Sequence, residues 1–293
     1  MGVMQRRFGQ TGLSVSMIGL GAGQIGVEEV SEAEAAEVLN GALDLGVTLI
    51  DTAASYGLSE ERIGRHVSGR RDEFVLSTKG GSGIDGVPDW SSESVTASID
   101  RSLRRTRSER LDIFFLHSCP VAVLERGDLQ ETLDEAVAAG KVGVAGYSGD
   151  NEHLGFAVDS GRFGALETSV NIADQWNLRN VVGRTSELGV IAKRPIANAP
   201  WRFAERPSGN YAELYWQRLR ELDLDPAELD WAEFALRFTA YAPGVDSAIT
   251  GTAKLANLRR NVEAASDGPL PDAVLDSIDQ AWQRVGADWP SST

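Results

Sequence analysis

The chain contains short apolar runs, and a stretch with the spacing of an amphipathic helix follows each of them. Eight such runs predict strands, at 17–22, 48–53, 74–79, 112–117, 142–148, 165–171, 189–195 and 247–251. They are rich in Val, Ile, Leu and Phe, which is typical of strands that are buried on both faces. Strands that alternate with helices indicate a parallel sheet.

Helix boundaries can be read in several of the intervening segments. Ser31, with Glu34 three residues later, predicts a capping box, and Gly46 suits the end of that helix. A second apolar stripe begins at Leu129 and stops before a glycine. The Asp-Pro-Ala-Glu segment at 225–228 predicts the start of another helix.

Eight repeats without a clear break favour a closed (β/α)8 TIM barrel that forms one domain over 1–293, although the length alone leaves one or two domains open. Segment 4–14 is expected to form a hairpin that closes the bottom of the barrel. Segment 196–225 is expected to be a long loop after the seventh strand. Loops of that length usually act as lids or are disordered.

Charge and composition narrow the classes of partner. The 28 basic and 43 acidic residues give a net charge of −15, which argues against nucleic acid and anionic membranes as partners. No apolar run is long enough to span a bilayer. A single cysteine, Cys119, excludes an internal disulfide, and the N-terminus lacks an apolar signal core, so the expected location is the cytoplasm. A small-molecule substrate, bound by a monomer or a small homo-oligomer, is the remaining expectation.

Polar residues stand at the carboxyl ends of the predicted strands, where barrels of this type build their active sites. They are Asp51, Lys79, His117, Ser148, Asn171, Lys193 and Thr252, and Tyr56 follows five residues after the first of them. Each residue alone has an ordinary structural explanation, such as a paired lysine or a capping aspartate. Their joint occurrence at successive strand ends indicates a site.

These positions resemble the motifs of the aldo-keto reductase superfamily. The similarity lies in segments 50–64, 75–79, 112–117 and 140–148, which hold in order an Asp and a Tyr, a Lys, a His and a Ser. The resemblance covers nearly the whole chain. It implies an NAD(P)H-dependent reductase that transfers hydride from the nicotinamide to an aldehyde or ketone.

The resemblance also implies roles for four catalytic residues. Tyr56 would give the proton, His117 would donate to the carbonyl oxygen, and Asp51 would orient Lys79. Lys79 is expected to lower the pKa of Tyr56. At about 4 Å and an effective dielectric of about 20, the pair is worth up to about 4 kcal/mol, or at most about three pKa units.

The same resemblance implies a cofactor site that favours NADPH, with NADH not excluded. Ser148 would bond the carboxamide, and Lys254 would pair with the 2′-phosphate. Glu167 and Lys193 depart from the family, which usually has a glutamine and an aromatic residue there. The residues expected to line this site are Gly21, Ala22, Gly23, Asp51, Ser148, Glu167, Asn171, Lys193, Arg194, Pro195, Gly251, Thr252, Lys254, Asn257 and Asn261.

The substrate pocket is expected to include Tyr56 and His117, with Trp90 and Trp201 as its walls. The short loop at 118–127 and the brief tail at 286–293 predict an open pocket and broad carbonyl specificity. Cys119 is interpreted as a bystander.

Two other functions were weighed. A cofactor-binding regulatory barrel without a dedicated metabolic substrate would keep the same four residues, but the chain shows no partner motif. A metal-dependent hydrolase or lyase would need several clustered His and carboxylate ligands. Only His117 lies at a strand end, whereas His66 and His153 fall in predicted helices, so no metal site is expected.

Overall fold

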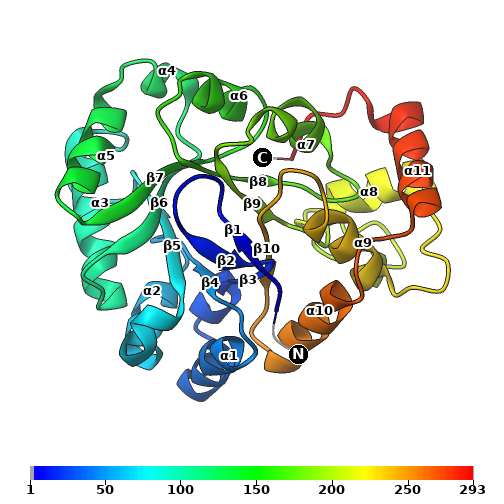
Figure 1. The fold of residues 1–293 in the computed structure, drawn as a ribbon, viewed down its shortest axis with the longest axis horizontal. Coiled ribbons are helices and arrows are strands. Elements are labelled where there is room, and N and C mark those ends of the chain that lie inside the picture. Colours follow the sequence, from blue (N-terminus) through cyan, green and yellow to red (C-terminus); the bar gives the residue numbers. More distant parts are fainter. Residues whose placement is uncertain (1–2, 293) are drawn as a thin grey trace.

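The computed structural model describes residues 3–292, and a closed barrel of parallel strands forms its centre (Figure 1). Around the barrel the order is β10-β3-β4-β5-β6-β7-β8-β9. The strands are β3 Ile18–Gly21, β4 Leu49–Asp51, β5 Val75–Gly80, β6 Leu111–His117, β7 Val142–Ser148, β8 Ala165–Ser169, β9 Gly189–Lys193 and β10 Ser247–Gly251. The predicted single-domain (β/α)8 barrel is therefore confirmed.

Helices surround the barrel. They are α1 Glu32–Asp44, α2 Ser59–His66, α3 Ser92–Thr106, α4 Val121–Leu124, α5 Asp128–Ala138, α6 Asn151–Asp159, α7 Trp176–Asn180, α8 Glu213–Leu222, α9 Trp231–Ala240, α10 Leu255–Ser266 and α11 Asp272–Ala281. The predicted capping box of α1 is present, because the Ser31 hydroxyl accepts a hydrogen bond from the Glu34 amide and the Glu34 carboxylate accepts one from the Ser31 amide.

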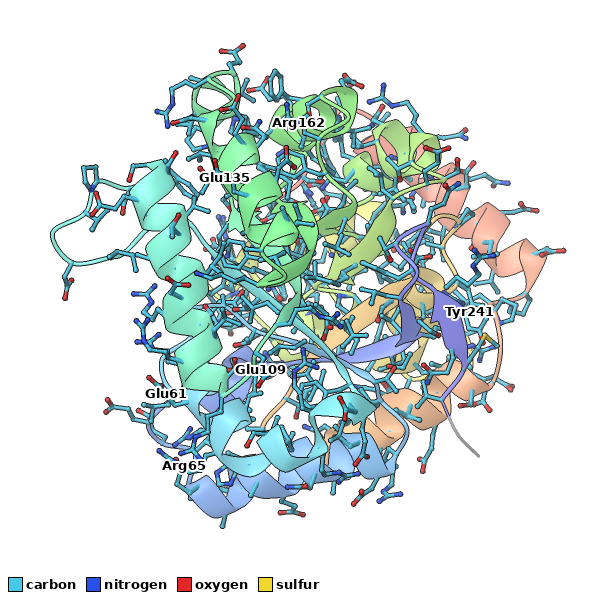
Figure 2. The ribbon with its side chains drawn as sticks, turned by 60° about the vertical axis from the view of Figure 1, so that its left-hand side comes forward. Glu61, Arg65, Glu109, Glu135, Arg162 and Tyr241 are labelled. Atoms are coloured by element: carbon cyan, nitrogen blue, oxygen red, sulfur yellow. The ribbon has the colours of Figure 1, made fainter. Side chains whose placement is uncertain are left out.

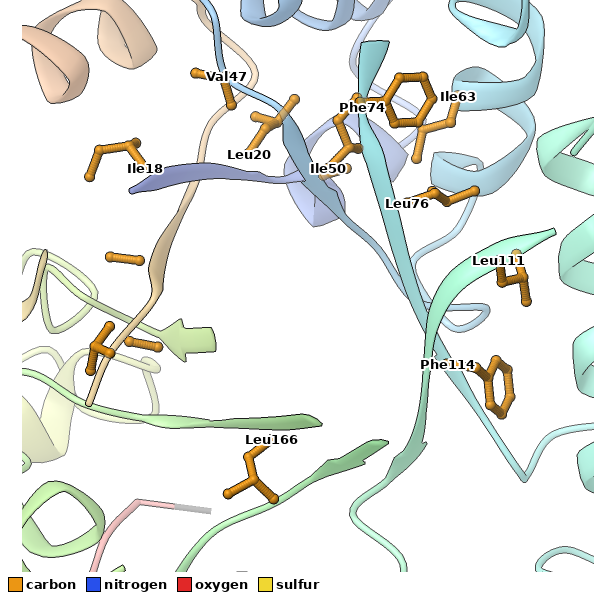
Figure 3. Packing of buried hydrophobic residues seen from close by; sticks show 14 of the residues in the cluster. Ile18, Leu20, Val47, Ile50, Ile63, Phe74, Leu76, Leu111, Phe114 and Leu166 are labelled. Carbon is orange, nitrogen blue, oxygen red and sulfur yellow. The ribbon is translucent and has the colours of Figure 1, made fainter. Parts of the chain in front are cut away.

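The barrel strands are buried on both faces. Leu76, Leu111 and Phe114 point outward and pack under the helices (Figure 3). Ile113 and Phe115 belong to a second cluster, which fills the barrel interior. This two-sided burial explains why the strands read as nearly continuous apolar runs.

An antiparallel hairpin of β1 Gln5–Arg7 and β2 Ser14–Ser16 precedes the barrel. Its fully buried Phe8 and Val15 join the interior cluster, and the Phe8 ring lies against Gly189 at the start of β9. The hairpin therefore fills the amino-terminal end of the barrel and leaves the opposite end for chemistry.

Two predictions after β9 were wrong. Segment 196–225 is not one long loop, because it contains α8, whose Tyr215, Arg218 and Leu222 are buried. The next helix does not begin at 225–228. It begins at Trp231, and the Asp230 side chain caps its amino terminus by accepting a hydrogen bond from the Ala232 amide.

Charged side chains cover the outer helices. Figure 2 shows Glu61 and Arg65 of α2, Glu135 of α5 and Arg162 after α6 projecting from the surface. Within residues 3–292, no helix is long and apolar enough to cross a membrane.

Candidate active site

A buried ion pair joins the ends of β4 and β5. The Lys79 ammonium donates to the Asp51 carboxylate over 2.6 Å and to the carbonyl oxygen of Thr52 over 2.9 Å. The Ser77 hydroxyl donates to the other Asp51 oxygen over 2.7 Å. Burial opposes the charge of Lys79, but the nearby carboxylates raise its pKa above the ordinary value, so the lysine stays charged.

A second carboxylate reaches the same ammonium from β8. Glu167 Oε2 lies 3.0 Å from Lys79 Nζ, and both side chains are almost fully buried. Burial and the negative charge of Asp51 raise the pKa of Glu167 to about 7. Glu167 therefore contacts the lysine, and its role toward the cofactor stays a prediction.

The loop that carries Tyr56 is held by close backbone contact with Gly26. The Leu58 amide donates to the carbonyl oxygen of Gly26 over 2.9 Å, and Gly57 adopts a φ of +53° beside it. A Cβ at Gly26 would collide with the Tyr56 carbonyl oxygen. Gly23, three residues before Gly26, lies against the tyrosine ring. These contacts fix the ring at the mouth of the barrel.

Tyr56 lies between the lysine and the histidine. Its ring centroid is 5.4 Å from Lys79 Nζ and 6.1 Å from the His117 ring, which meets it edge-on. Lys79 draws the pKa of Tyr56 down, but burial and the charges of Glu167 and Asp51 raise it above the ordinary value for tyrosine. Lys79 thus has the predicted lowering effect on the pKa of Tyr56, but burial, Glu167 and Asp51 together outweigh it.

His117 ends β6 and faces Tyr56. Burial and the positive charge of Lys79 lower its pKa to about 4. The imidazole is therefore neutral near pH 7. In that form one ring nitrogen still carries a hydrogen and donates a hydrogen bond.

Two buried hydroxyl groups at the strand ends fit a bound cofactor. Ser148 Oγ at the end of β7 and Thr250 Oγ1 in β10 have no hydrogen-bond partner among the described residues. Gly21 and Gly251 pair across β3 and β10, and a Cβ on Gly21 would lie 3.5 Å from Gly251. Unsatisfied hydroxyls beside an exposed backbone provide polar contacts for a nicotinamide nucleotide.

Other predicted cofactor residues have partners within the chain. Lys193 pairs with Asp150 over 2.9 Å, and Arg194 donates to the Ser292 carbonyl oxygen over 2.8 Å. Asn171 is fully buried, and its amide bonds the backbone at Ala173 and Arg194. Arg194 and Pro195 follow β9, which ends at Lys193.

Two of the residues in these contacts, Asp150 and Ser292, were not predicted from the sequence. Asp150 stands two residues after Ser148, so its position just past a strand end was a usable signal. The contact of Arg194 with the Ser292 carbonyl oxygen could not be predicted, because 98 residues of sequence separate the two.

Thr252 and the first turns of α10 form the last predicted part of the cofactor site. The Lys254 amide and the Asn257 side chain both donate to the Thr252 hydroxyl, over 3.0 and 3.3 Å. The Lys254 side chain is exposed. Arg260, which was not predicted, donates to the side-chain Oδ1 of Asn257 over 2.6 Å, and the partly buried Asn261 follows it.

The predicted pocket walls lie in different surroundings. Trp90 packs against Gly81, two residues after Lys79. Trp201 stacks on Trp231 of α9 with 5.9 Å between ring centroids. Cys119 is buried, and burial raises the pKa of its thiol to about 12, so it remains protonated.

The arrangement defines a class of protein. A (β/α)8 barrel that gathers a tyrosine, a charged lysine, a neutral histidine and two carboxylates at one end is an enzyme fold with a site for proton transfer. Within residues 3–292, no group of three or more His, Cys, Asp or Glu side chains could hold a metal ion.

Comparisons with known proteins identify the family. Residues 17–283 match the model of the aldo/keto reductase family. The oxidoreductase YqkF of Bacillus subtilis is 26% identical, covering 94% of this chain and 95% of its own length. The L-glyceraldehyde 3-phosphate reductase of Escherichia coli is 28% identical, covering 95% of this chain and 92% of its own length.

Solved structures agree on the fold. The holo form of an aldo-keto reductase from Bacillus halodurans superposes with a TM-score of 0.82 at 23% identity, covering 95% of this chain and 96% of that one. The chain belongs to the aldo/keto reductase family, whose members are oxidoreductases that act on small carbonyl compounds with nicotinamide cofactors.

Proposed function

We propose that this protein is an NADPH-dependent reductase of aldehydes or ketones in which Tyr56 is the proton donor. The observation that carries the proposal is the position of Tyr56 between His117 and the buried Lys79. When bound, the reduced nicotinamide supplies the hydride that the carbonyl carbon accepts.

The side chains of this site account for the remaining chemistry. Negative charge develops on the carbonyl oxygen as its carbon is reduced. The neutral His117 donates its N–H to that oxygen, and Tyr56 gives it a proton, so the tyrosine O–H bond breaks and a substrate O–H bond forms. The Lys79 ammonium stabilises the phenolate until water returns the proton.

The cofactor would be held by residues from several strand ends. Ser148 Oγ would bond the carboxamide, and the backbone at Gly21 and Gly251 would allow close approach. The exposed ammonium of Lys254 at the start of α10, with Arg260 six residues further along the chain, supports recognition of a 2′-phosphate. These cations are the reason for preferring NADPH to NADH.

The test is turnover by the purified protein. We expect NADPH absorbance at 340 nm to fall when a reactive aldehyde such as 4-nitrobenzaldehyde is added, with one alcohol formed for each NADPH consumed. The control is the same mixture without aldehyde. Absence of carbonyl-dependent loss across a panel of aldehydes and ketones contradicts the proposal.

A further inference from the structure

Lys79 is held by two carboxylates that come from different strands of the barrel. Asp51 lies 2.6 Å away and takes a direct hydrogen bond, whereas Glu167 Oε2 lies 3.0 Å away on β8. Glu167 is 2% exposed, and this oxygen makes no well-aligned hydrogen bond among the described residues. Burying a carboxylate is costly unless a cation is nearby, and Lys79 is the cation that Glu167 contacts. Packing alone therefore does not explain the carboxylate.

The charge balance around Tyr56 gives a reason for Glu167. With Asp51 alone, the pair with Lys79 would be neutral overall. The second carboxylate makes the cluster net negative, and it lies near a phenol whose ring is 5.4 Å from the ammonium. A negative environment disfavours the phenolate form of tyrosine.

We propose that Glu167 is a positioning residue for the proton donor: by sharing the Lys79 ammonium with Asp51, it keeps the Tyr56 hydroxyl protonated and favours carbonyl reduction over alcohol oxidation. The second half of this inference rests on the proposed function, because only a carbonyl reductase uses Tyr56 in this way. A protonated phenol is the form needed to reduce a carbonyl. Alcohol oxidation needs the phenolate, which must accept a proton from the alcohol.

Glu167 itself is titratable, so its charge depends on pH. Burial and the charge of Asp51 raise its pKa, so a fall in pH neutralises Glu167 and leaves Asp51 as the one carboxylate that offsets Lys79 near Tyr56. The charged and titratable groups that face these two side chains are Asp51 from β4, Lys79 from β5, His117 from β6, and Lys193 and Arg194 at the end of β9.

The direct test is an NMR titration of tyrosine in the cofactor-free protein. Protein labelled with 13C at tyrosine Cζ gives signals that report each phenol's ionisation, and Tyr56→Phe assigns the signal of interest. In Glu167→Gln, which keeps the side-chain shape, we expect the Tyr56 midpoint to fall by about 1 to 2 pH units.

Glu60→Gln is the matched control. Glu60 is also buried, but it accepts a hydrogen bond from Thr78 and contacts Arg105, away from the lysine ammonium. Its substitution should leave the Tyr56 midpoint in place. An unchanged or raised midpoint in a folded Glu167→Gln protein overturns the proposal.

Activity supplies a second readout. In Glu167→Gln the alkaline rise of alcohol oxidation should move to lower pH by the same interval. A merely structural role would lower the rate without moving the profile. Because the NMR titration needs no turnover, a protein that reduces no carbonyl refutes the proposed function while the titration still tests the charge arrangement.

Discussion

Replacing Glu167 by glutamine should stabilise the protein at alkaline pH and change it little at acid pH. The pKa of this carboxyl rises from 4.5 to about 7 on folding, because the buried site disfavours its charge. The folded protein therefore binds a proton more tightly than the unfolded chain. This tighter proton binding contributes to the free energy of unfolding. The contribution is fully present below about pH 4.5, is lost as pH rises through about 7, and amounts to about 3 kcal/mol in total.

Urea unfolding followed by tryptophan fluorescence measures this effect at about pH 5 and about pH 8.5. The free energy of unfolding of Glu167→Gln, minus that of the unaltered protein, should grow by about 2–3 kcal/mol between the two conditions, because a small part of the effect is already present at pH 5. Glu152→Gln is the control, because that side chain is 89% exposed and its replacement should give the same difference at both pH values. If the free energy of unfolding of Glu167→Gln differs from that of the unaltered protein by the same amount at both pH values, or falls relative to it as pH rises, the reasoning is refuted.

Three further predictions concern the architecture and the nucleotide. Gly26→Ala should lower the free energy of unfolding by about 1–3 kcal/mol and disturb the loop of the proton donor. Gly155→Ala, whose Cβ meets open space, should do neither, and urea unfolding compares the two variants. Ser148→Ala should weaken NADPH binding roughly 2- to 10-fold in a fluorescence titration, unlike Ser102→Ala, which removes another buried unpartnered hydroxyl on α3. Lys254→Ala should weaken NADPH binding at least about tenfold and NADH binding less than about twofold, and equal losses would disprove the phosphate contact.

The fold could be predicted because its signals are local. Each barrel strand is an apolar run, and each strand end is marked by a change to polar residues. The positions of Asp51, Lys79 and His117 at those ends follow from this pattern. Helix α8 was missed because Pro207 and Gly209 just before it suggested a loop, while burial of its Tyr215 depends on distant partners.

The electrostatics of the site could not be predicted in the same way. The sequence shows that Tyr56 follows one predicted strand and that Lys79 lies at the end of the next. It does not show that Glu167 reaches Lys79 from the other side of the barrel. Glu167 is one of the groups that raise the pKa of Tyr56, together with burial and Asp51. Likewise, Lys193 lies beside Asp150 only because β7 and β9 flank β8.

The central claim is that Tyr56 donates the proton to a carbonyl oxygen, and Tyr56→Phe tests it most directly. Steady-state reduction of a reactive aldehyde should show kcat at least about a hundredfold below that of the unaltered protein, the lower range for loss of a general acid. NADPH affinity, measured by fluorescence, should remain within about twofold, because the ring and its contact with Gly23 are kept. A kcat within about threefold of the unaltered value would contradict the account.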